Sequence, residues 1–180
     1  YIINWSFEED TFNDVTVLRL FGYDRNKKSV SVRIEDFYVI CYLELPPEID
    51  WVKYSSSLSN CIKEKFKSKP LKMELEMKKR LYNPEYKKVG DKYEQVLFPF
   101  LKVSFATFSK MRDFIGQARY GLYVAGLGKI NVNVHCGNNS LTPSIRFIDM
   151  LDIPPTGWVK LECVVYIDDV DKETTKQREF

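Results

Sequence analysis

Short runs in which apolar and polar residues alternate are the most constraining feature of this sequence. A period of two places successive side chains on opposite faces of a β-strand. Val30, Val32 and Ile34 alternate with polar residues, and this run follows the β-branched run at residues 15–20 across a polar turn at residues 22–28. The two runs and the turn between them predict a β-hairpin.

The rest of the chain interleaves strand patterns with helix patterns. Further strands are predicted at residues 37–45, 71–81, 99–105, 130–134 and 158–167. Apolar residues at helical spacing predict helices at residues 55–66, 108–118 and 142–151. Pro and Gly mark loops at residues 83–91 and 121–128. The order predicts an α+β fold, β-rich and mostly antiparallel, with two or three helices.

Some of these predictions are specific enough to test one by one. The strand at residues 37–45 is apolar and aromatic enough to be buried on both faces. At residues 71–81 the alternation favours a strand although the residue types favour a helix, and the alternation is the stronger signal. Possible N-caps for the three helices are residues 55–57, Thr107 or Ser109, and Ser140 or Thr142.

Composition excludes several classes of protein. The chain has 180 residues, of which 44% are hydrophobic and 29% charged, which is too apolar for disorder and typical of a globular domain. Apolar runs are too short to cross a bilayer. The four cysteines are widely spaced, which disfavours a zinc site and indicates reduced thiols in an intracellular compartment.

Charge is distributed unevenly, although the net charge is only +2. Residues 61–88 hold ten Lys or Arg against four Glu, a balance of +6, and residues 162–173 hold five acidic residues against one Lys, a balance of −4. Such asymmetry favours a surface that faces a polyanion, or else a solvated helix face.

No assembled active site is evident. His135 is the only histidine, and Cys136 beside it on a strand would point to the opposite face, which disfavours a catalytic pair. The glycines at residues 126 and 128 lack the rest of a phosphate-binding loop. An acidic cluster (Asp168, Asp169, Asp171 and Glu173) resembles part of a nuclease metal site but has no second constellation. We therefore expect no catalytic residue, metal or cofactor within this chain.

A strip of alternating basic and aromatic side chains is the best candidate binding feature. It consists of Lys78, Lys79, Arg80, Tyr82, Lys87, Lys88 and Tyr93. Cations that track phosphates and rings that stack on bases are typical of single-strand binding, whereas the alternative is a solubilising surface. Trp158, after a Pro-Pro-Thr-Gly turn, is a candidate buried anchor at a junction between domains.

Several segments, in order, resemble the start of family B DNA polymerases, especially those of large DNA viruses and the eukaryotic delta polymerase. They are VLRLFGY at residues 17–23, SVSV at 29–32, FYVICYLELP at 37–46, FPFLKVSF at 98–105 with MRDF at 111–114, and finally HCGNN, IRFID and PPTGWV at 135–139, 145–149 and 154–159. The resemblance covers nearly the whole chain and rests on the order and spacing of these segments.

The resemblance implies a non-catalytic amino-terminal part of a DNA-directed DNA polymerase. It implies an amino-terminal domain at residues 1–139 and a segment at 140–180 that leads towards a 3′–5′ exonuclease domain. Tyr1 in place of Met and the polar end of the chain fit a sequence cut from a longer one. The first Asp-x-Glu exonuclease motif has no convincing copy here, so the catalytic carboxylates, and the Mg²⁺ that the parent enzyme needs, are expected downstream.

In relatives this region guides the single-stranded template and packs on the exonuclease domain. Arg146 matches an arginine beside a template-uracil pocket, but the Pro-Tyr pair of that pocket is Val39-Ile40 here, so general template contact is the prediction. The implied partners are single-stranded template or primer-template DNA, the rest of the polymerase chain and a sliding clamp or other processivity factor, in the nucleus or at a viral replication site. The alternatives are a stand-alone single-strand-binding or protein-docking module, and a small metal-dependent nuclease.

Overall fold

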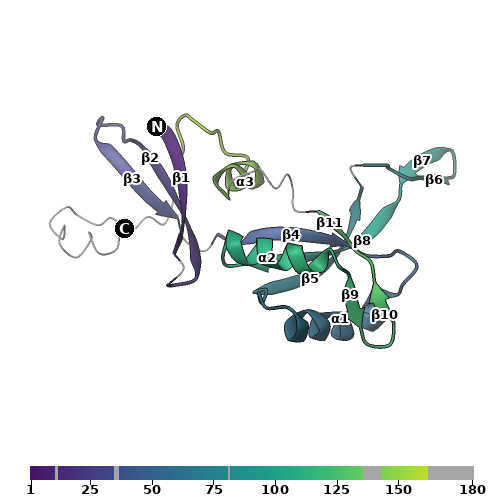
Figure 1. Cartoon of the computed structure of the whole chain (residues 1–180). Coiled ribbons are helices and arrows are strands. Elements are labelled where there is room, and N and C mark those ends of the chain that lie inside the picture. The colour runs from purple at the N-terminus through teal and green to yellow at the C-terminus, as the bar shows by residue number, and fades with distance from the viewer. Residues whose placement is uncertain (11, 35–36, 81, 136–142, 162–180) are drawn as a thin grey trace.

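The computed structural model describes residues 1–10, 12–34, 37–80, 82–135 and 143–161 (Figure 1). One antiparallel sheet has the order β1-β2-β3 and is made of β1 (Ile2–Asp10), β2 (Val15–Tyr23) and β3 (Ser29–Ile34). The β2–β3 pair confirms the hairpin predicted from the alternating runs. Its turn is closed by Asp24, whose carboxylate accepts hydrogen bonds from the backbone amides of Asn26 and Lys28.

A second antiparallel sheet has the order β11-β4-β8-β5. Its strands are β4 (Val39–Glu44), β5 (Lys72–Lys79), β8 (Leu97–Phe105) and β11 (Asn133–His135). Helix α1 (Trp51–Lys65) connects β4 to β5, and α2 (Phe108–Ala118) follows β8. The strands predicted at residues 37–45, 71–81 and 99–105 and the helix at 108–118 are thus confirmed. Thr107 caps α2, since its hydroxyl oxygen accepts from the Lys110 amide.

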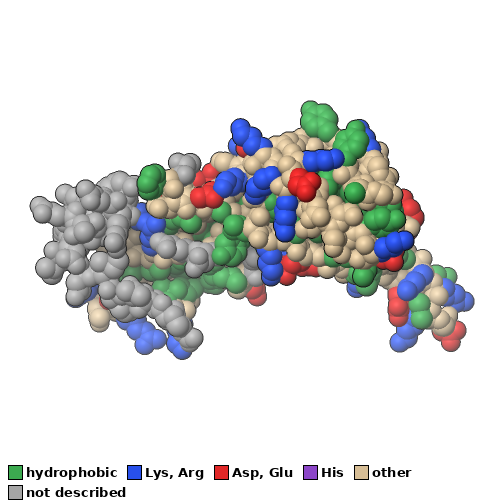
Figure 2. Space-filling model, turned by 90° about the horizontal axis from the view of Figure 1, so that it is seen from below, with side chains coloured by type: hydrophobic (Ala, Val, Ile, Leu, Met, Phe, Trp, Pro, Cys, Tyr) green, Lys and Arg blue, Asp and Glu red, His purple; other side chains and the backbone are tan. Residues whose placement is uncertain are grey.

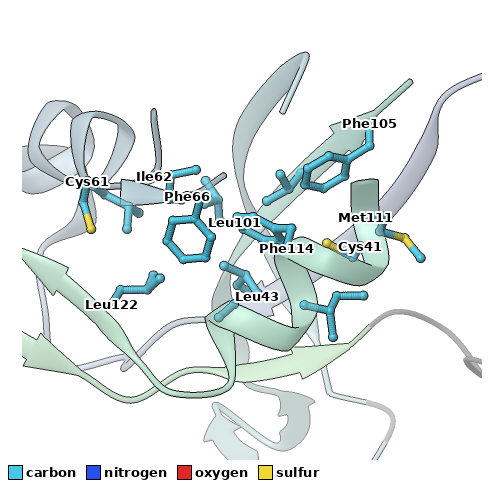
Figure 3. Packing of buried hydrophobic residues seen from close by; sticks show 14 of the residues in the cluster. Cys41, Leu43, Cys61, Ile62, Phe66, Leu101, Phe105, Met111, Phe114 and Leu122 are labelled. Carbon is cyan, nitrogen blue, oxygen red and sulfur yellow. The ribbon is translucent and has the colours of Figure 1, made fainter. Parts of the chain in front are cut away.

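The hydrophobic core lies between one face of this second sheet and the two helices. Alternate strand residues such as Leu43, Leu101 and Phe105 are buried against side chains of α1 and α2 (Figure 3). The ring of Phe114 in α2 lies 4.7 Å from that of Phe66 and 5.0 Å from that of Phe105, measured between centroids. Aromatic packing therefore joins both helices to the sheet.

The opposite face of this sheet differs from the prediction for residues 37–45. Val39, Cys41 and Leu43 are buried on the helix side of β4, whereas Ile40 and Tyr42 on the other side are partly exposed and only Glu44 at its end is buried there. The reason is that α1 and α2 both pack on the other face, so the side of β4 that carries Tyr42 has no helix over it among the described residues.

Helix α1 begins four residues earlier than predicted. Asp50, rather than a serine of 55–57, is the N-cap: its carboxylate accepts from the amides of Val52 and Lys53. The buried Trp51 ring, whose Nε1 donates to the Pro46 carbonyl at 2.8 Å, holds the first turn against the end of β4. Because Trp51 is buried against the end of β4, the helix begins before the first residue of its apolar repeat.

Two predicted loops contain strands. Residues 83–91 include β6 (Tyr86–Val89), which pairs with β7 (Lys92–Gln95), and residues 121–128 include β9 (Leu122–Val124), which pairs with β10 (Gly128–Ile130). The strand predicted at 130–134 is split, because β10 closes a hairpin while β11 joins the larger sheet. In both hairpins, β6–β7 and β9–β10, a short glycine-containing turn is present where the sequence predicts a longer loop.

The last helix and the segment after it lie against β1. Helix α3 (Pro143–Met150) places the Phe147 ring 5.9 Å from that of Trp5 and 5.4 Å from that of Phe37. Its predicted caps, Ser140 and Thr142, lie outside the described residues. Residues 158–161 form no strand, and the remainder of the strand predicted at 158–167 lies outside the described part.

The predicted fold class is confirmed as β-rich, antiparallel and with three helices in the described chain. Strand β1 was not predicted, since its residues lack a clear alternation and its pairing with β2 sets its conformation. No helix in the described ranges is long and apolar enough to cross a membrane.

Candidate nucleic-acid interface

The β6–β7 hairpin is the part of the basic and aromatic strip that projects from the body of the protein. It is inserted between β5 and β8 and extends beyond the end of the second sheet (Figure 1). A two-residue turn, Gly90-Asp91, joins its strands, and Gly90 has φ of +62°, which favours glycine. In Figure 2 this end of the molecule shows basic side chains beside hydrophobic ones.

The hairpin register decides which side chains share a face. Tyr86 is opposite Gln95, and Lys88 is opposite Tyr93. Because directly opposed residues lie on the same face of an antiparallel pair, these four form one face. The other face holds two further opposed pairs: Lys87 with Glu94, and Val89 with Lys92.

Arg80 stands at the base of the hairpin and is bound to carboxylates of the protein itself. Its Nε lies 2.5 Å from Oε1 of Glu44, and its Nη1 lies 2.7 Å from Oε1 of Glu85. The guanidinium carbon is 3.5 Å from the centroid of the Phe98 ring. Arg80 is therefore poorly available for the predicted contact with template, because its N–H donors bind Glu44 and Glu85 and one face of its guanidinium group packs on the Phe98 ring.

Glu44 is the centre of this arrangement. Only 6% of its side chain is exposed, and its second oxygen lies 2.8 Å from Nε2 of His135 on β11. A buried carboxylate needs such partners, since an unpaired buried charge is costly. His135 thus takes part in a side-chain pair that joins β11 to β4.

Lys78 is also engaged within the protein. Its Nζ donates to the Tyr42 hydroxyl at 2.9 Å and lies 3.2 Å from Oε2 of Glu76. Burial lowers the pKa of Lys78, but the hydrogen bonds to Tyr42 and Glu76 raise it by more, so the net direction is upward. Lys78 is therefore charged, and the neighbouring Glu76 carboxylate balances its charge.

The same face of the sheet continues as a ladder of alternating charges. Lys102 lies 3.3 Å from Glu74 and 3.4 Å from Glu76, and Lys72 lies 2.8 Å from Glu74. The hydrogen bond to Glu74, against opposing burial, raises the pKa of Lys102, and hydrogen bonds from Lys72 and Lys102 lower the pKa of Glu74. The side of β5 that carries Lys78 therefore presents a balanced surface rather than a cationic one.

The predicted site residues fall into three groups. Lys78 and Arg80 are paired with carboxylates, while Lys79 is exposed on the other side of β5. Tyr82, Lys87, Lys88 and Tyr93 are exposed on or immediately before the hairpin. Arg146 belongs to α3, which lies beside β1 and apart from the hairpin, and its side chain lies outside the described part (Figure 1).

Sequence reasoning missed Tyr86 and Lys92, which lie in the hairpin with the predicted residues. The signal that could have found Tyr86 is the two-residue turn Gly90-Asp91, which favours a hairpin between the short runs on either side of it. Pro84 and Gly90 made the segment read as a loop instead.

Trp158, the candidate anchor at a domain junction, is exposed in the described chain. Its side chain is 61% exposed, so it is not buried in the described structure, and its ring meets the edge of Tyr1 with centroids 5.8 Å apart. The backbone beside it is what holds the segment: the Ile2 amide donates to the Gly157 carbonyl at 2.7 Å. Nε1 of Trp5 donates to the Pro155 carbonyl at 2.9 Å. The Pro-Pro-x-Gly segment is thus fixed to β1 while the Trp158 ring faces outwards.

Metal, thiol and phosphate-loop chemistry were the other candidates. No group of three His, Cys, Asp or Glu side chains among the described residues could hold a metal ion. Cys41 and Cys61 are buried. Gly126, in the turn between β9 and β10, and Gly128, the first residue of β10, both have positive φ, which is a structural use of glycine. Cys136, Cys163 and the acidic cluster at residues 168–173 lie outside the described part.

No family model matches this chain. It is 24% identical over 184 residues to DNA polymerase 120R of Invertebrate iridescent virus 3, covering all of this chain and 16% of that protein. It is 23% identical over 173 residues to DNA polymerase 037L of Invertebrate iridescent virus 6, covering 87% of this chain and 12% of that protein. The chain therefore spans less than one fifth of the length of these relatives.

A solved structure has the same fold. The family B DNA polymerase from the hyperthermophilic archaeon Pyrobaculum calidifontis superposes with a TM-score of 0.51 over 82% of this chain and 15% of that one, at 15% sequence identity.

Proposed function

We propose that this chain, an amino-terminal part of a family B DNA polymerase by its motifs, its viral relatives and its fold, acts in DNA replication by contacting the single-stranded template. The observation that carries the proposal is sequence relatedness to a viral DNA polymerase over the whole chain. Polymerase and exonuclease activity, and the Mg²⁺ that they require, are proposed for the parent protein and assigned to residues beyond this chain.

Template contact is supported by the exposed part of the basic and aromatic strip. Lys87, Lys88, Tyr82 and Tyr93 project into solvent at one end of the molecule, where a strand of DNA has access from several sides. DNA and the rest of the polymerase are therefore the proposed partners, together with a processivity factor, at a site of viral replication.

Salt dependence tests the template contact directly. Binding of the 180-residue chain to a fluorescein-labelled dT oligonucleotide, followed by anisotropy, should weaken steeply with salt because phosphate contacts release counterions. For two to three phosphates we expect an affinity loss of about 7- to 20-fold between 50 and 200 mM salt. A dA oligonucleotide should bind within a few-fold of dT, because rings stack on any base. Absence of single-strand binding at low salt contradicts the proposed contact.

Packing on a following exonuclease domain is the second part of the proposal, and the outward-facing Trp158 ring supports it. In the present chain Trp158→Ala should cost about 1 kcal/mol or less, since the ring is mostly exposed. In a longer protein that includes the next domain, burial of the ring should raise the loss to about 3 kcal/mol. Denaturant unfolding of both proteins measures the difference, and equal small losses contradict the packing.

A further inference from the structure

We propose that one face of the β6–β7 hairpin is a stacking platform for single-stranded DNA, on which bases stack against Tyr86 and Tyr93 while Lys88 meets a phosphate. This inference rests on the proposed function and assigns the contact to a single face. It adds Tyr86 to the site and removes Lys78 and Arg80 from it.

The first support is the register of the hairpin. Tyr86 and Tyr93 lie on the same face, one residue pair apart, because Tyr86 is opposite Gln95 and Tyr93 is opposite Lys88. Such diagonal neighbours are about 7–8 Å apart, within reach of each other for large rings. Lys88 lies directly across from Tyr93 and two residues along the strand from Tyr86, so it neighbours both tyrosines on this face.

The second support is that the only cation on the Tyr86 face has no carboxylate across from it, although Lys92 gives the opposite face the same net charge of +1. The Tyr86 face carries one lysine and no carboxylate. On the opposite face Lys87 is directly across from Glu94, and such a pair weakens attraction for a phosphate. Proteins that bind single-stranded nucleic acids combine aromatic rings, on which bases stack, with cationic side chains that contact phosphates.

The third support is exposure. The side chains of Tyr86 and Tyr93 are 60% and 71% exposed, and within the described chain no ring contact or hydrogen bond engages either of them. Tyrosine offers a large rigid surface that loses little conformational freedom on binding. Two such rings on one face of an uncovered two-stranded hairpin are available to a ligand without rearrangement.

The fourth support is the rigid base of the hairpin. The Val96 amide donates to the Glu85 carbonyl at 2.7 Å, and Nε2 of Gln95 donates to the Arg80 carbonyl at 2.8 Å. Arg80 binds Glu85 on the hairpin and Glu44 on the sheet. The β6–β7 hairpin is therefore fixed to the sheet at its base, and this reduces the conformational entropy that is lost on binding.

Matched variants on the two faces test the inference. Lys88→Gln and Lys87→Gln make the same chemical change on adjacent residues with opposite orientation. Binding of the 180-residue chain to the fluorescein-labelled dT oligonucleotide should weaken several-fold more for Lys88→Gln than for Lys87→Gln. Tyr86→Ala and Tyr93→Ala should each weaken binding about 5- to 30-fold. Tyr86→Phe and Tyr93→Phe should bind within about two-fold of the unchanged chain, since the ring is kept.

A dT oligonucleotide that contains one 2-aminopurine reports stacking separately from affinity. Its fluorescence should fall on binding to the unchanged chain and to the phenylalanine variants, and fall less with Tyr86→Ala at saturating protein. Thermal melts of all variants should agree with the unchanged chain, because the altered side chains are exposed. If an alanine variant melts early, the comparison of Lys88→Gln with Lys87→Gln decides the test.

Two results have different meanings. If the unchanged chain binds the oligonucleotide while the alanine variants bind equally well, or Lys87→Gln and Lys88→Gln weaken binding equally, the stacking face is overturned and template contact stands. If the unchanged chain binds no oligonucleotide at low salt, template contact and the stacking face both fail.

Discussion

Replacing Arg80 with alanine is expected to destabilise the protein by about 2–4 kcal/mol, far more than any other change in the basic and aromatic strip. The reason is Glu44, which is almost fully buried and, among the described residues, would keep only His135 as a side-chain partner. Removing Arg80 also uncovers the Phe98 ring and breaks the link to Glu85 at the base of the hairpin. Urea unfolding followed by circular dichroism measures the loss.

A double-mutant cycle separates the charge effect from the loss of packing. In the Arg80→Ala background, Glu44→Gln should restore part of the stability, because a neutral amide needs no counter-charge. Lys79→Ala, an exposed neighbour on the other side of β5, is the control and should change stability by less than about 0.5 kcal/mol. A similar small loss for Arg80→Ala and Lys79→Ala would contradict the structural role of Arg80.

Phe114→Ala should produce the largest loss of stability, about 3–5 kcal/mol. The ring is completely buried and contacts the rings of Phe66 and Phe105, so its removal leaves a cavity between α2 and the second sheet and ends two aromatic contacts. Thermal and urea unfolding should both show the change.

Phe12→Ala is the matched control, because it makes the same chemical change at a side chain that is 95% exposed. It should leave the midpoint of unfolding unchanged within about 0.5 kcal/mol. If the two alanine variants unfolded at the same urea concentration, the core as described between α2 and the sheet would be wrong.

Much of the fold was predictable because its strongest signals are local. The β2–β3 hairpin, the strands β4, β5 and β8, and helix α2 all follow from alternation or helical spacing within a short window. For β5 the alternation of Met73, Leu75 and Met77 correctly outweighed helix-forming residue types, because the strand pairs with β8 along its whole length, although Leu75 and Met77 stay exposed.

What was missed depends on contacts between distant residues. Strand β1 is held by β2, and the start of α1 is set by burial of Trp51 against Pro46. Neither relation has a signature in the local residue pattern. Strands β6 and β9 are short, and Pro and Gly residues alone do not distinguish their tight turns from longer loops.

The candidate site was predictable in composition but not in arrangement. Clustered lysines and tyrosines pointed to the stretch of chain that contains the exposed β6–β7 hairpin. That Arg80 is bound to Glu44 follows from the order β4-β8-β5, which brings together two residues on strands that are not neighbours. The exposed cations of the hairpin could be told from the paired cations of β5 only once this register was known.

The pairing of Lys79 with Leu97 has a consequence for how this protein can vary. These residues close the ladder between β5 and β8, so the hairpin begins where the sheet has already been completed. Apart from Arg80, which is bound to Glu44, the stretch between them can change in length or sequence without shifting the strands or the aromatic core behind them. The residues that form the sheet and those of the hairpin that are proposed to bind DNA therefore occupy adjacent but separate segments of the chain. The hairpin can diverge in sequence while the strands of the sheet are conserved.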